Sequence, residues 1–285
     1  MMNTFRRFYR RLKSSVLCVV VYIVVINVVC LYYLSRAPSP WISHHGPFFL
    51  AHLRRGGYTC KTIGFSPTPM PLTALASFPG SGNTWLRHLV QQATGIATGS
   101  VYNDLILKHH GFPGEGVRDS RVVMVKTHEW GSEHRREFSR AVLLIRDPFD
   151  SLLAEFNRRY GGHRGHALPH DFDKDWQTYV SVQSRGWVEM NTDWLNFDGP
   201  LLIMQYRDLQ TNMLNETRRL FNFLNMRVSD PELVCMVSNA HGNFKRPKSQ
   251  VLPQVRYSYF MRSTIGKYIQ NVTKEIQNYY KLRKS

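Results

Sequence analysis

The chain has 285 residues, with 43% hydrophobic and 13% aromatic residues, a composition that excludes an intrinsically disordered protein. Its formal net charge of +17 predicts an acidic partner, such as a phosphorylated cofactor, an anionic glycan, nucleic acid or a membrane surface. No run of Lys and Arg interleaved with aromatic residues stands out as a nucleic-acid-binding surface, and charge alone does not choose among these partners.

The N-terminal region has the pattern of a membrane anchor. Residues 1–15 are basic, and residues 16–34 carry no charged side chain. A helix of that length spans about 28 Å, close to the hydrocarbon thickness of a bilayer. Basic residues before the span place the N-terminus in the cytosol and the rest of the chain in a lumen. A cleaved signal peptide is the alternative, because Ser35-Arg36-Ala37 loosely resembles a cleavage site, but we expect a retained anchor.

Residues 35–71 are rich in proline and are interpreted as a stem, followed by a lumenal domain over residues 72–285. In an oxidising lumen, Cys60 and Cys235 form either one disulfide or two unpaired buried thiols. No Cys/His spacing is typical of a zinc site. Asn215 and Asn271 each begin a sequon for N-glycosylation.

The first element of the domain is an apolar strand over residues 72–78, which leads into a glycine-rich turn and a helix from Asn83. This arrangement points backbone N–H groups and a helix N-terminus at one place, where phosphate or sulfate binds. Gly80 and Gly82 allow close approach of an anion, and Ser81 and Thr84 add hydroxyl donors. The nucleoside-triphosphate loop needs Lys where this chain has Asn83. A tight strand-to-helix connection without a ligand is the alternative.

The remaining elements alternate in type. A polar connection over residues 104–118 precedes three more strands, predicted over residues 121–126, 141–146 and 201–206. Helices are predicted from Asp147-Pro148, over 173–196, over about 212–224 and over about 230–239. The glycine- and histidine-rich segment 161–172 is either a mobile lid or an exposed loop. The tryptophans of 173–196 are expected in the core. The alternation predicts an α/β domain with a parallel sheet flanked by helices.

Polar residues follow these strands at the edge where open parallel sheets bind ligands. Lys126 and Arg146 are suited to phosphate or sulfate oxygens, and Arg207 and Asp208 follow Tyr206 at the last strand. His128 is the best candidate for a general base, because neutral imidazole accepts a hydroxyl proton near neutral pH.

The same residues resemble the motifs of sulfotransferases over about residues 72–250. Residues 78–85 resemble the loop that binds the 5′-phosphosulfate, which includes Gly80, Ser81, Gly82, Asn83, Thr84 and Trp85. Residues 145–151 look like the motif whose arginine, here Arg146, binds the 3′-phosphate, and 125–128 are similar to the segment with the catalytic histidine. Tyr206-Arg207-Asp208-Leu209 and Phe244-Lys245-Arg246 resemble two later cofactor-binding segments. The first loop is most similar to the WSC-domain-containing (WSCD) family of type II Golgi membrane proteins, although this chain lacks the cysteine-rich WSC modules.

The resemblance implies metal-free transfer of a sulfuryl group from 3′-phosphoadenosine-5′-phosphosulfate (PAPS) to a glycan hydroxyl in the Golgi lumen. His128 is then the base, Lys126 stabilises the leaving oxygen, and Lys245 and Arg246 join Arg146 at the 3′-phosphate. A glycan and a membrane are the expected partners, not nucleic acid, and vertebrate relatives suggest sialic acid.

The chain departs from the sulfotransferase pattern at two positions. Gly80 stands where sulfotransferases usually have Lys or Arg, a role that Lys126 or Arg87 could take over. Ala154 stands where a serine is expected, with Ser151 nearby in the sequence. Two alternatives follow: a catalytically weak protein that keeps the fold and binds nucleotide or sulfated glycan, and a P-loop kinase, which Asn83 disfavours.

Overall fold

A computed structural model of the protein describes residues 60–244, 246 and 257–283. The predicted cytoplasmic tail 1–15 and transmembrane segment 16–34 lie outside the described residues, as does the predicted stem up to residue 59. Among the described helices, none combines the length and apolarity needed to cross a membrane. The last part of the predicted stem lies against the domain, because the N–H of Gly64 donates to the carbonyl of Gly95 and that of Ser66 to the carbonyl of Arg121.

A single sheet of five parallel strands organises the described domain, in the order β2-β3-β1-β4-β5. The strands are β1 (Thr73–Ala76), β2 (Gly99–Ser100), β3 (Val125–Thr127), β4 (Arg140–Ile145) and β5 (Leu201–Gln205). Three of the four predicted strands lie where expected, and β2 was missed because a two-residue edge strand has no apolar run to reveal it. All five strands run the same way, so their carboxyl ends meet at one edge.

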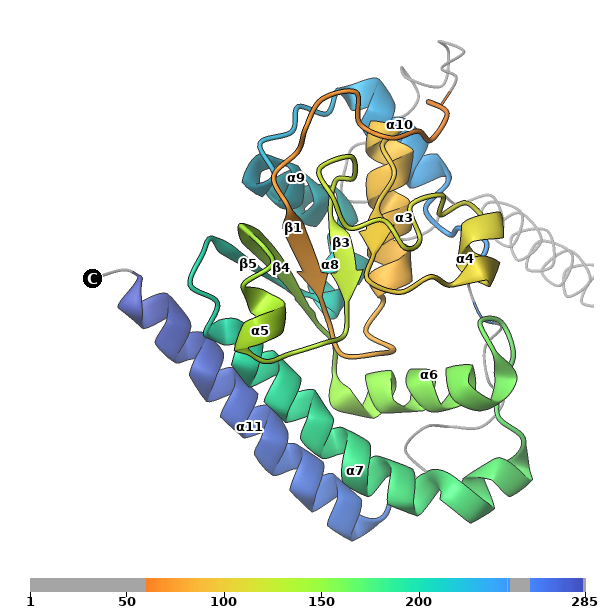
Figure 1. The fold of residues 1–285 in the computed structure, drawn as a ribbon. Coiled ribbons are helices and arrows are strands. Elements are labelled where there is room, and N and C mark those ends of the chain that lie inside the picture. The colour runs from red at the N-terminus through yellow and green to blue at the C-terminus, as the bar shows by residue number, and fades with distance from the viewer. Residues whose placement is uncertain (1–59, 245, 247–256, 284–285) are drawn as a thin grey trace, which may run out of the picture. The chain divides into compact units, whose positions relative to one another are not determined.

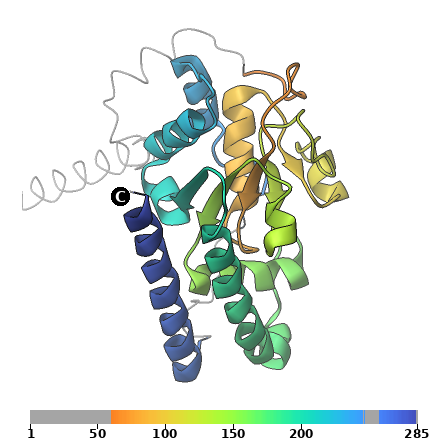
Figure 2. The ribbon, with the colours of Figure 1, turned by 60° about the vertical axis from the view of Figure 1, so that its left-hand side comes forward.

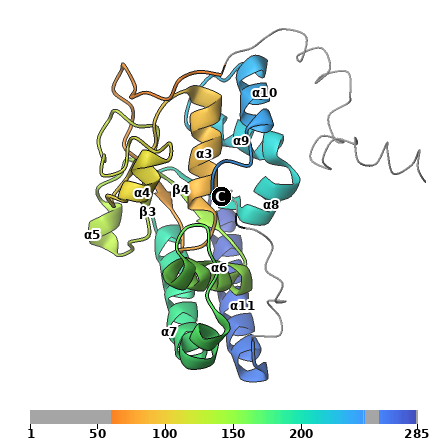
Figure 3. The same cartoon turned by 90° about the vertical axis from the view of Figure 1, so that its right-hand side faces the viewer.

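Helices cover both faces of this sheet, as Figures 1 and 3 show. The helices are α3 (Asn83–Thr94), α4 (Leu105–His109), α5 (Ser132–Arg135), α6 (Pro148–Gly161), α7 (Pro169–Leu195), α8 (Tyr206–Thr211), α9 (Met213–Phe223), α10 (Asp230–Ser238) and α11 (Tyr259–Leu282). Side chains alternate along each strand, so Leu75 packs with α3, α9 and α10, whereas Ala74 and Ala76 pack with α6, α7 and α11. The predicted α/β architecture is therefore confirmed.

The start of α6 follows directly from its sequence. The side chain of Asp147 accepts a hydrogen bond from the N–H of Phe149 at 2.8 Å, which satisfies one free donor of the first turn. Pro148 occupies the first helical position, where its missing N–H leaves no bond unmade. This cap fixes the turn from β4 into α6 and thereby places Arg146, the residue before it, at the sheet edge.

The long helix α7 supplies much of the core beneath the sheet. Trp176, Trp187 and Trp194 are 5%, 2% and 0% exposed, which confirms that these tryptophans pack in the core. Figure 2 shows α11 lying along α7. No element is predicted beyond residue 239, although Ile265, Ile269, Val272, Ile276 and Tyr279 recur at helical spacing and pack against the core.

Two predicted boundaries differ from the structure by four residues. The second predicted strand begins only at Val125, and residues 122–124 are buried without forming a regular strand, because an apolar run reports burial and not strand pairing. The predicted loop 161–172 shrinks to 162–168, since α6 continues to Gly161 and α7 begins at Pro169. Proline is favourable in the first turn of a helix, so α7 begins four residues before the position predicted from its tryptophans.

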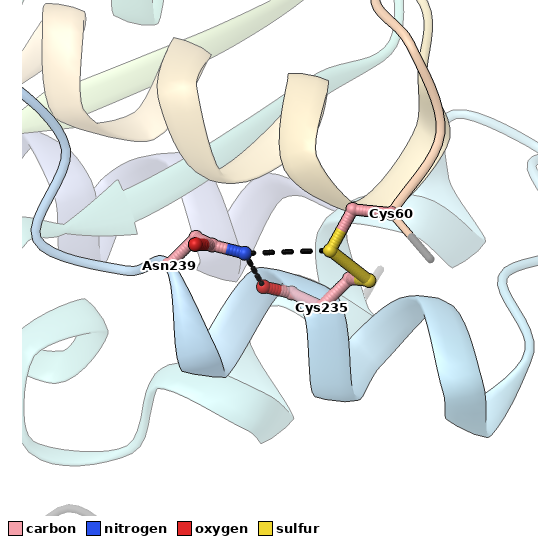
Figure 4. The surroundings of a disulfide bond; sticks show 3 residues. All are labelled: Cys60, Cys235 and Asn239. Atoms are coloured by element: carbon pink, nitrogen blue, oxygen red, sulfur yellow. Dashed lines mark hydrogen bonds between the residues drawn. A yellow bond between two sulfur atoms is a disulfide. The ribbon is translucent and has the colours of Figure 1, made fainter. Parts of the chain in front are cut away.

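A disulfide joins Cys60 to Cys235 of α10, as Figure 4 shows, and this decides between the two states expected for these cysteines. The side-chain amide of Asn239 donates to the carbonyl of Cys235 at 3.0 Å and to the sulfur of Cys60 at 3.4 Å. The bond encloses a sequence separation of 175 residues. It therefore ties the start of the described domain to the helix that precedes the predicted basic segment, residues 244–246, in the sequence.

We expect the double substitution Cys60→Ser with Cys235→Ser to lower the free energy of unfolding by about 2–5 kcal/mol, because an unfolded chain without the cross-link has more conformational freedom. Urea denaturation of the full chain measures this change. Dithiothreitol should lower the wild-type midpoint toward that of the variant and leave the variant unchanged. A wild-type midpoint that does not respond to reductant would contradict the stabilising role of the disulfide.

Candidate functional site

The turn between β1 and α3 presents an open helix N-terminus. Gly82 is the N-cap of α3 with φ 93°, and neither a side-chain cap nor an acidic residue occupies the first turn. The first N–H groups of an α-helix have no partner within the helix, and the helix dipole adds partial positive charge there. The 12-residue helix α3 therefore offers Asn83, Thr84 and Trp85 as backbone donors for an anion.

Both glycines of this turn are required by close contacts. At Gly80, with φ 79°, a Cβ atom would lie 2.3 Å from the carbonyl oxygen of Ser151 in α6. At Gly82, a Cβ atom would lie 2.4 Å from Cε2 of Tyr206 in α8. The turn is thus held between two helices that follow β4 and β5, and a cation at position 80 is incompatible with this arrangement.

The polar side chains of the turn have different environments. Ser81 is 1% exposed, and its hydroxyl has no hydrogen-bond partner among the described residues. The amide of Asn83 donates to the carbonyl of Leu75 at 3.1 Å and to the hydroxyl of Ser77 at 3.1 Å, so it fastens α3 to the end of β1. Thr84 is half-buried in the first turn. The hydroxyl of Ser81 is therefore an unused hydrogen-bonding group at the turn, while Asn83 holds the turn in place.

His128 lies just beyond the end of β3 and beside the turn. Its Nδ1 is 2.6 Å from the carbonyl oxygen of Ser77, and a carbonyl can only accept, so Nδ1 carries the proton in the neutral ring. The lone pair is then on Nε2. Burial, as the main cause, and the nearby charge of Lys126, as the second, lower the pKa of His128 to about 3. The imidazole is therefore neutral near pH 7, with the lone pair of Nε2 unprotonated.

Lys126 is opposite Leu75 in the β1–β3 pairing, which places it at the same edge as His128. Burial, as the main cause, and repulsion from Arg87, as the second, lower the pKa of Lys126 to about 8. Its ammonium lies 5.4 Å from the centre of the Tyr102 ring, and no carboxylate lies within salt-bridge distance in the described part of the chain. Lys126 is thus a cation whose charge is available to a ligand.

Arg87, the other cation considered for the missing position in the loop, is excluded. It is fully buried and donates to Glu115 at 2.6 Å and to Thr98 through its side chain. Both partners of the Arg87–Glu115 pair have no exposed side-chain surface. The pair fastens α3 to the connection after β2 and leaves Lys126 as the substitute cation.

Arg146 joins the turn to α8. Its guanidinium donates to the carbonyl of Gly80 at 2.9 Å and lies 4.4 Å from the ring centre of Tyr206. Its Nε is buried without a hydrogen-bond partner among the described residues. Tyr206 is the first residue of α8 and not the last of the strand, because β5 ends at Gln205.

A cavity of about 480 Å³ opens beside Arg146 and Tyr206. It is also lined by Asp147, Phe149, Asp150, Arg207, Gln210, Tyr257 and Arg262. Ser151, the serine near the departure at Ala154, is fully buried instead, and its hydroxyl donates to the carbonyl of Pro148 at 3.4 Å. Ser151 is therefore unavailable to a ligand.

Arg246, from the predicted basic segment 244–246, contacts α6 and the residue that follows it. Arg246 donates to the carbonyl of Ala154 at 2.7 Å and to that of Gly162 at 3.0 Å, and its Nε has no hydrogen-bond partner among the described residues. Lys245 lies outside the described residues. Trp85 donates to the carbonyl of Ala240 at 2.7 Å and meets Tyr206 edge-to-face at 5.6 Å. The structure thus brings the turn, Arg146, Tyr206 and Arg246 together around α6 and α8.

Sequence reasoning missed Tyr102, which follows the unpredicted strand β2. Its hydroxyl donates to Glu129 at 2.7 Å and accepts the N–H of His128 at 3.1 Å. The signal for it was weak, because it belongs to a short polar connection without a recognisable period. Tyr102 connects the edge strand to the residues that follow β3.

Because the contact at Gly80 is with backbone, we expect Gly80→Ala and Gly80→Lys to lower the free energy of unfolding. The decrease should exceed that of Gly111→Ala by about 1–3 kcal/mol. Gly111 is the matched control: it also has positive φ, 103°, but a Cβ atom there would meet nothing within 4 Å. Urea denaturation of the three variants measures the difference, and equal destabilisation at both positions would refute the close contact.

Comparison with known proteins relates this geometry to other chains. The sequence matches no protein-family model. The fold is similar to that of a mouse sulfotransferase, SULT7A1, crystallised with PAP, with a TM-score of 0.51, 13% identity and coverage of 77% of this chain and 89% of that one. At this identity the likeness concerns the fold alone, and it confirms the sulfotransferase-type architecture.

Three relatives are much more similar in sequence. The chain is 46% identical over 199 residues to WSCD family member CG9164 of Drosophila melanogaster and 46% identical over 203 residues to WSCD family member GA21586 of Drosophila pseudoobscura pseudoobscura. It is 44% identical over 199 residues to WSCD family member AAEL009094 of Aedes aegypti. The matches cover 68–70% of this chain and 62–64% of the relatives, so the chain spans less than two thirds of their length. On this similarity, the protein belongs to the WSCD family.

Proposed function

We propose that this protein transfers a sulfuryl group from PAPS to a hydroxyl of a glycan acceptor in the Golgi lumen. The observation that carries the proposal is the position of His128: an imidazole with its lone pair on Nε2 lies beside an uncapped helix N-terminus. Lys126 adds positive charge at the same edge of the sheet. Together they combine an anion site with a proton acceptor.

The residues around the turn fit a nucleotide that carries several anionic groups. The hydroxyl of Ser81 and the Nε atoms of Arg146 and Arg246 are buried without hydrogen-bond partners among the described residues. Leaving a buried polar group unpaired costs about 1–3 kcal/mol, so phosphate or sulfate oxygens would remove a penalty at each. Trp85 and Tyr206 supply aromatic surface beside them. The mouse sulfotransferase of similar fold was crystallised with PAP.

The proposed reaction is an in-line displacement at sulfur. PAPS supplies the sulfuryl group, and the leaving group is the 5′-phosphate of the remaining nucleotide, PAP. Nε2 of His128 accepts the proton of the acceptor hydroxyl, while the oxygen of that hydroxyl forms the new bond to sulfur. The carbonyl of Ser77 accepts a hydrogen bond from Nδ1–H, and this bond both fixes the tautomer and restrains the ring. Lys126 and the first N–H groups of α3 stabilise the negative charge that develops on the departing oxygen when the sulfur–oxygen bond breaks.

The compartment and the acceptor class are supported by features outside the site. Disulfides such as Cys60–Cys235 form in oxidising compartments, including the secretory pathway. Asn215 in α9 and Asn271 in α11 are exposed, as N-glycosylation sites must be in the folded chain. The predicted anchor 16–34 makes the protein a single-pass type II membrane protein, and the net charge of +17 suits an anionic glycan such as one ending in sialic acid.

The test is transfer of labelled sulfate from PAPS to a mixed glycan pool by the full chain. We expect His128→Ala to lower kcat by about 10²–10⁴-fold, since a positioned base contributes that much, with unchanged affinity for PAP. His134→Ala is the matched control, because His134 lies in α5 and pairs with Glu133. Wild-type protein that binds PAP without transferring sulfate would favour a binding role, and full activity of His128→Ala would exclude His128 as the base.

The two lowered pKa values predict an unusual pH profile. With a pKa of about 3, His128 stays neutral well below pH 6.5, so kcat/KM should lack the acidic limb of an ordinary histidine base. Lys126, with a pKa of about 8, loses its charge as the pH rises, so kcat/KM should fall above about pH 8. Lys126→Arg keeps the charge and should move that limb to higher pH. An acidic limb centred near 6.5 would contradict the lowered pKa of His128.

A further inference from the structure

Tyr102 touches both residues proposed to act on the reacting groups. It lies two residues past the end of β2, just after Val101, whose N–H donates to the carbonyl of Lys126 at 3.0 Å. Its ring is stacked on the imidazole of His128, with centres 5.6 Å apart and planes inclined by 26°. The other contact of the ring is with the ammonium of Lys126, 5.4 Å from its centre.

The hydroxyl of Tyr102 makes a second, separate set of contacts. It accepts the backbone N–H of His128 at 3.1 Å and donates to the carboxylate of Glu129 at 2.7 Å. The backbone of Glu129 is fixed in turn, because its carbonyl accepts the indole N–H of Trp194 at 2.9 Å, and Trp194 is fully buried. Burial and the bond to Glu129 raise the pKa of Tyr102, so the hydroxyl remains a donor at any physiological pH.

We infer that Tyr102 is a positioning residue that holds the imidazole of His128 and the ammonium of Lys126 beside the turn before α3. The inference rests on the proposed function for its kinetic consequence. The hydroxyl fixes the backbone at His128, while the ring limits rotation of the imidazole and stabilises a cation over its face. The bond from Nδ1 of His128 to Ser77 fixes one edge of the imidazole, and the stacked Tyr102 ring restrains the tilt of its plane about that bond.

These two contributions can be separated by substitution. Tyr102→Phe keeps the ring and removes both hydroxyl bonds, whereas Tyr102→Leu removes the hydroxyl and the ring. We expect Tyr102→Phe to lower kcat with little change in KM for PAPS and to leave the alkaline limb in place. Tyr102→Leu should lower kcat further and move the alkaline limb down by roughly 0.4–1.5 pH units, because the lost cation–π contact no longer favours charged Lys126.

A measurement that needs no turnover separates this inference from the proposed function. The full chain is labelled with [13C]lysine, the Cε signal of Lys126 is identified by its loss in Lys126→Met, and its titration is followed in wild type and both Tyr102 variants. A lower titration midpoint in Tyr102→Leu alone supports the inference even where the sulfate-transfer assay fails. Transfer activity with an unchanged midpoint in Tyr102→Leu overturns it and leaves the proposed function standing.

Tyr279→Leu is the matched control. Tyr279 is also half-buried, donates through its hydroxyl to the carbonyl of Leu201 at 3.1 Å and has the guanidinium of Arg283 4.5 Å from its ring centre. It belongs to α11 and touches neither Lys126 nor His128. A general loss of stability should therefore appear in both leucine variants, whereas only Tyr102→Leu should move the titration of Lys126. Equal shifts in both variants would refute a specific role for Tyr102.

Discussion

The turn after β1 lies against the backbone of α6, and this contact leaves no room for a side chain at Gly80. The carbonyl of Gly80 faces the guanidinium of Arg146, which also lies over the ring of Tyr206. At Gly82, a Cβ atom would likewise lie 2.4 Å from Cε2 of Tyr206. Three segments far apart in the sequence are therefore fixed relative to one another by contacts that only glycine permits, and the candidate site depends on this arrangement.

The cationic side chains beside the turn, Lys126 and Arg146, lie at the ends of strands and do not belong to the turn itself. Lys126 and Arg87 are both cations close to the turn, but they differ in whether a carboxylate pairs with them. Arg87 forms a fully buried ion pair with Glu115, and removing either partner would leave an unpaired charge in the core. Lys126 has no such carboxylate among the described residues, so burial lowers its pKa while its charge remains free to meet an anion. Arg87 therefore contributes to the fold, whereas the charge of Lys126 is available to a ligand at the candidate site.

The disulfide links the stability of the domain to this site. Cys235 lies in α10, and the segment just after that helix receives hydrogen bonds from α3: Trp85 donates to Ala240, and His88 is bonded to Asn239. The side chain of Asn239 also reaches the sulfur of Cys60. The disulfide therefore anchors the segment that accepts the hydrogen bond of Trp85, which packs against Tyr206 at the candidate site.

The sequence alone determined the alternation of strands and helices, because continuous apolar runs and helical spacing are local patterns. It also identified the turn, Lys126, His128 and Arg146 as polar residues of one sheet edge, since parallel strands place their carboxyl ends together. Arg246 was identified only through the resemblance to sulfotransferases. It could not reveal β2 or Tyr102, because a two-residue edge strand carries no periodic signal.

Only the tertiary structure decided which polar groups are free. Asn83 and Arg87 resemble ligand-binding residues in the sequence, yet their hydrogen bonds go to the carbonyl of Leu75 and to Glu115, partners that the sheet brings into reach. The protonated nitrogen of His128 likewise depends on the carbonyl of Ser77, fifty-one positions earlier in the chain. A residue type states what a side chain can do, whereas its availability depends on neighbours that are distant in sequence and close in space.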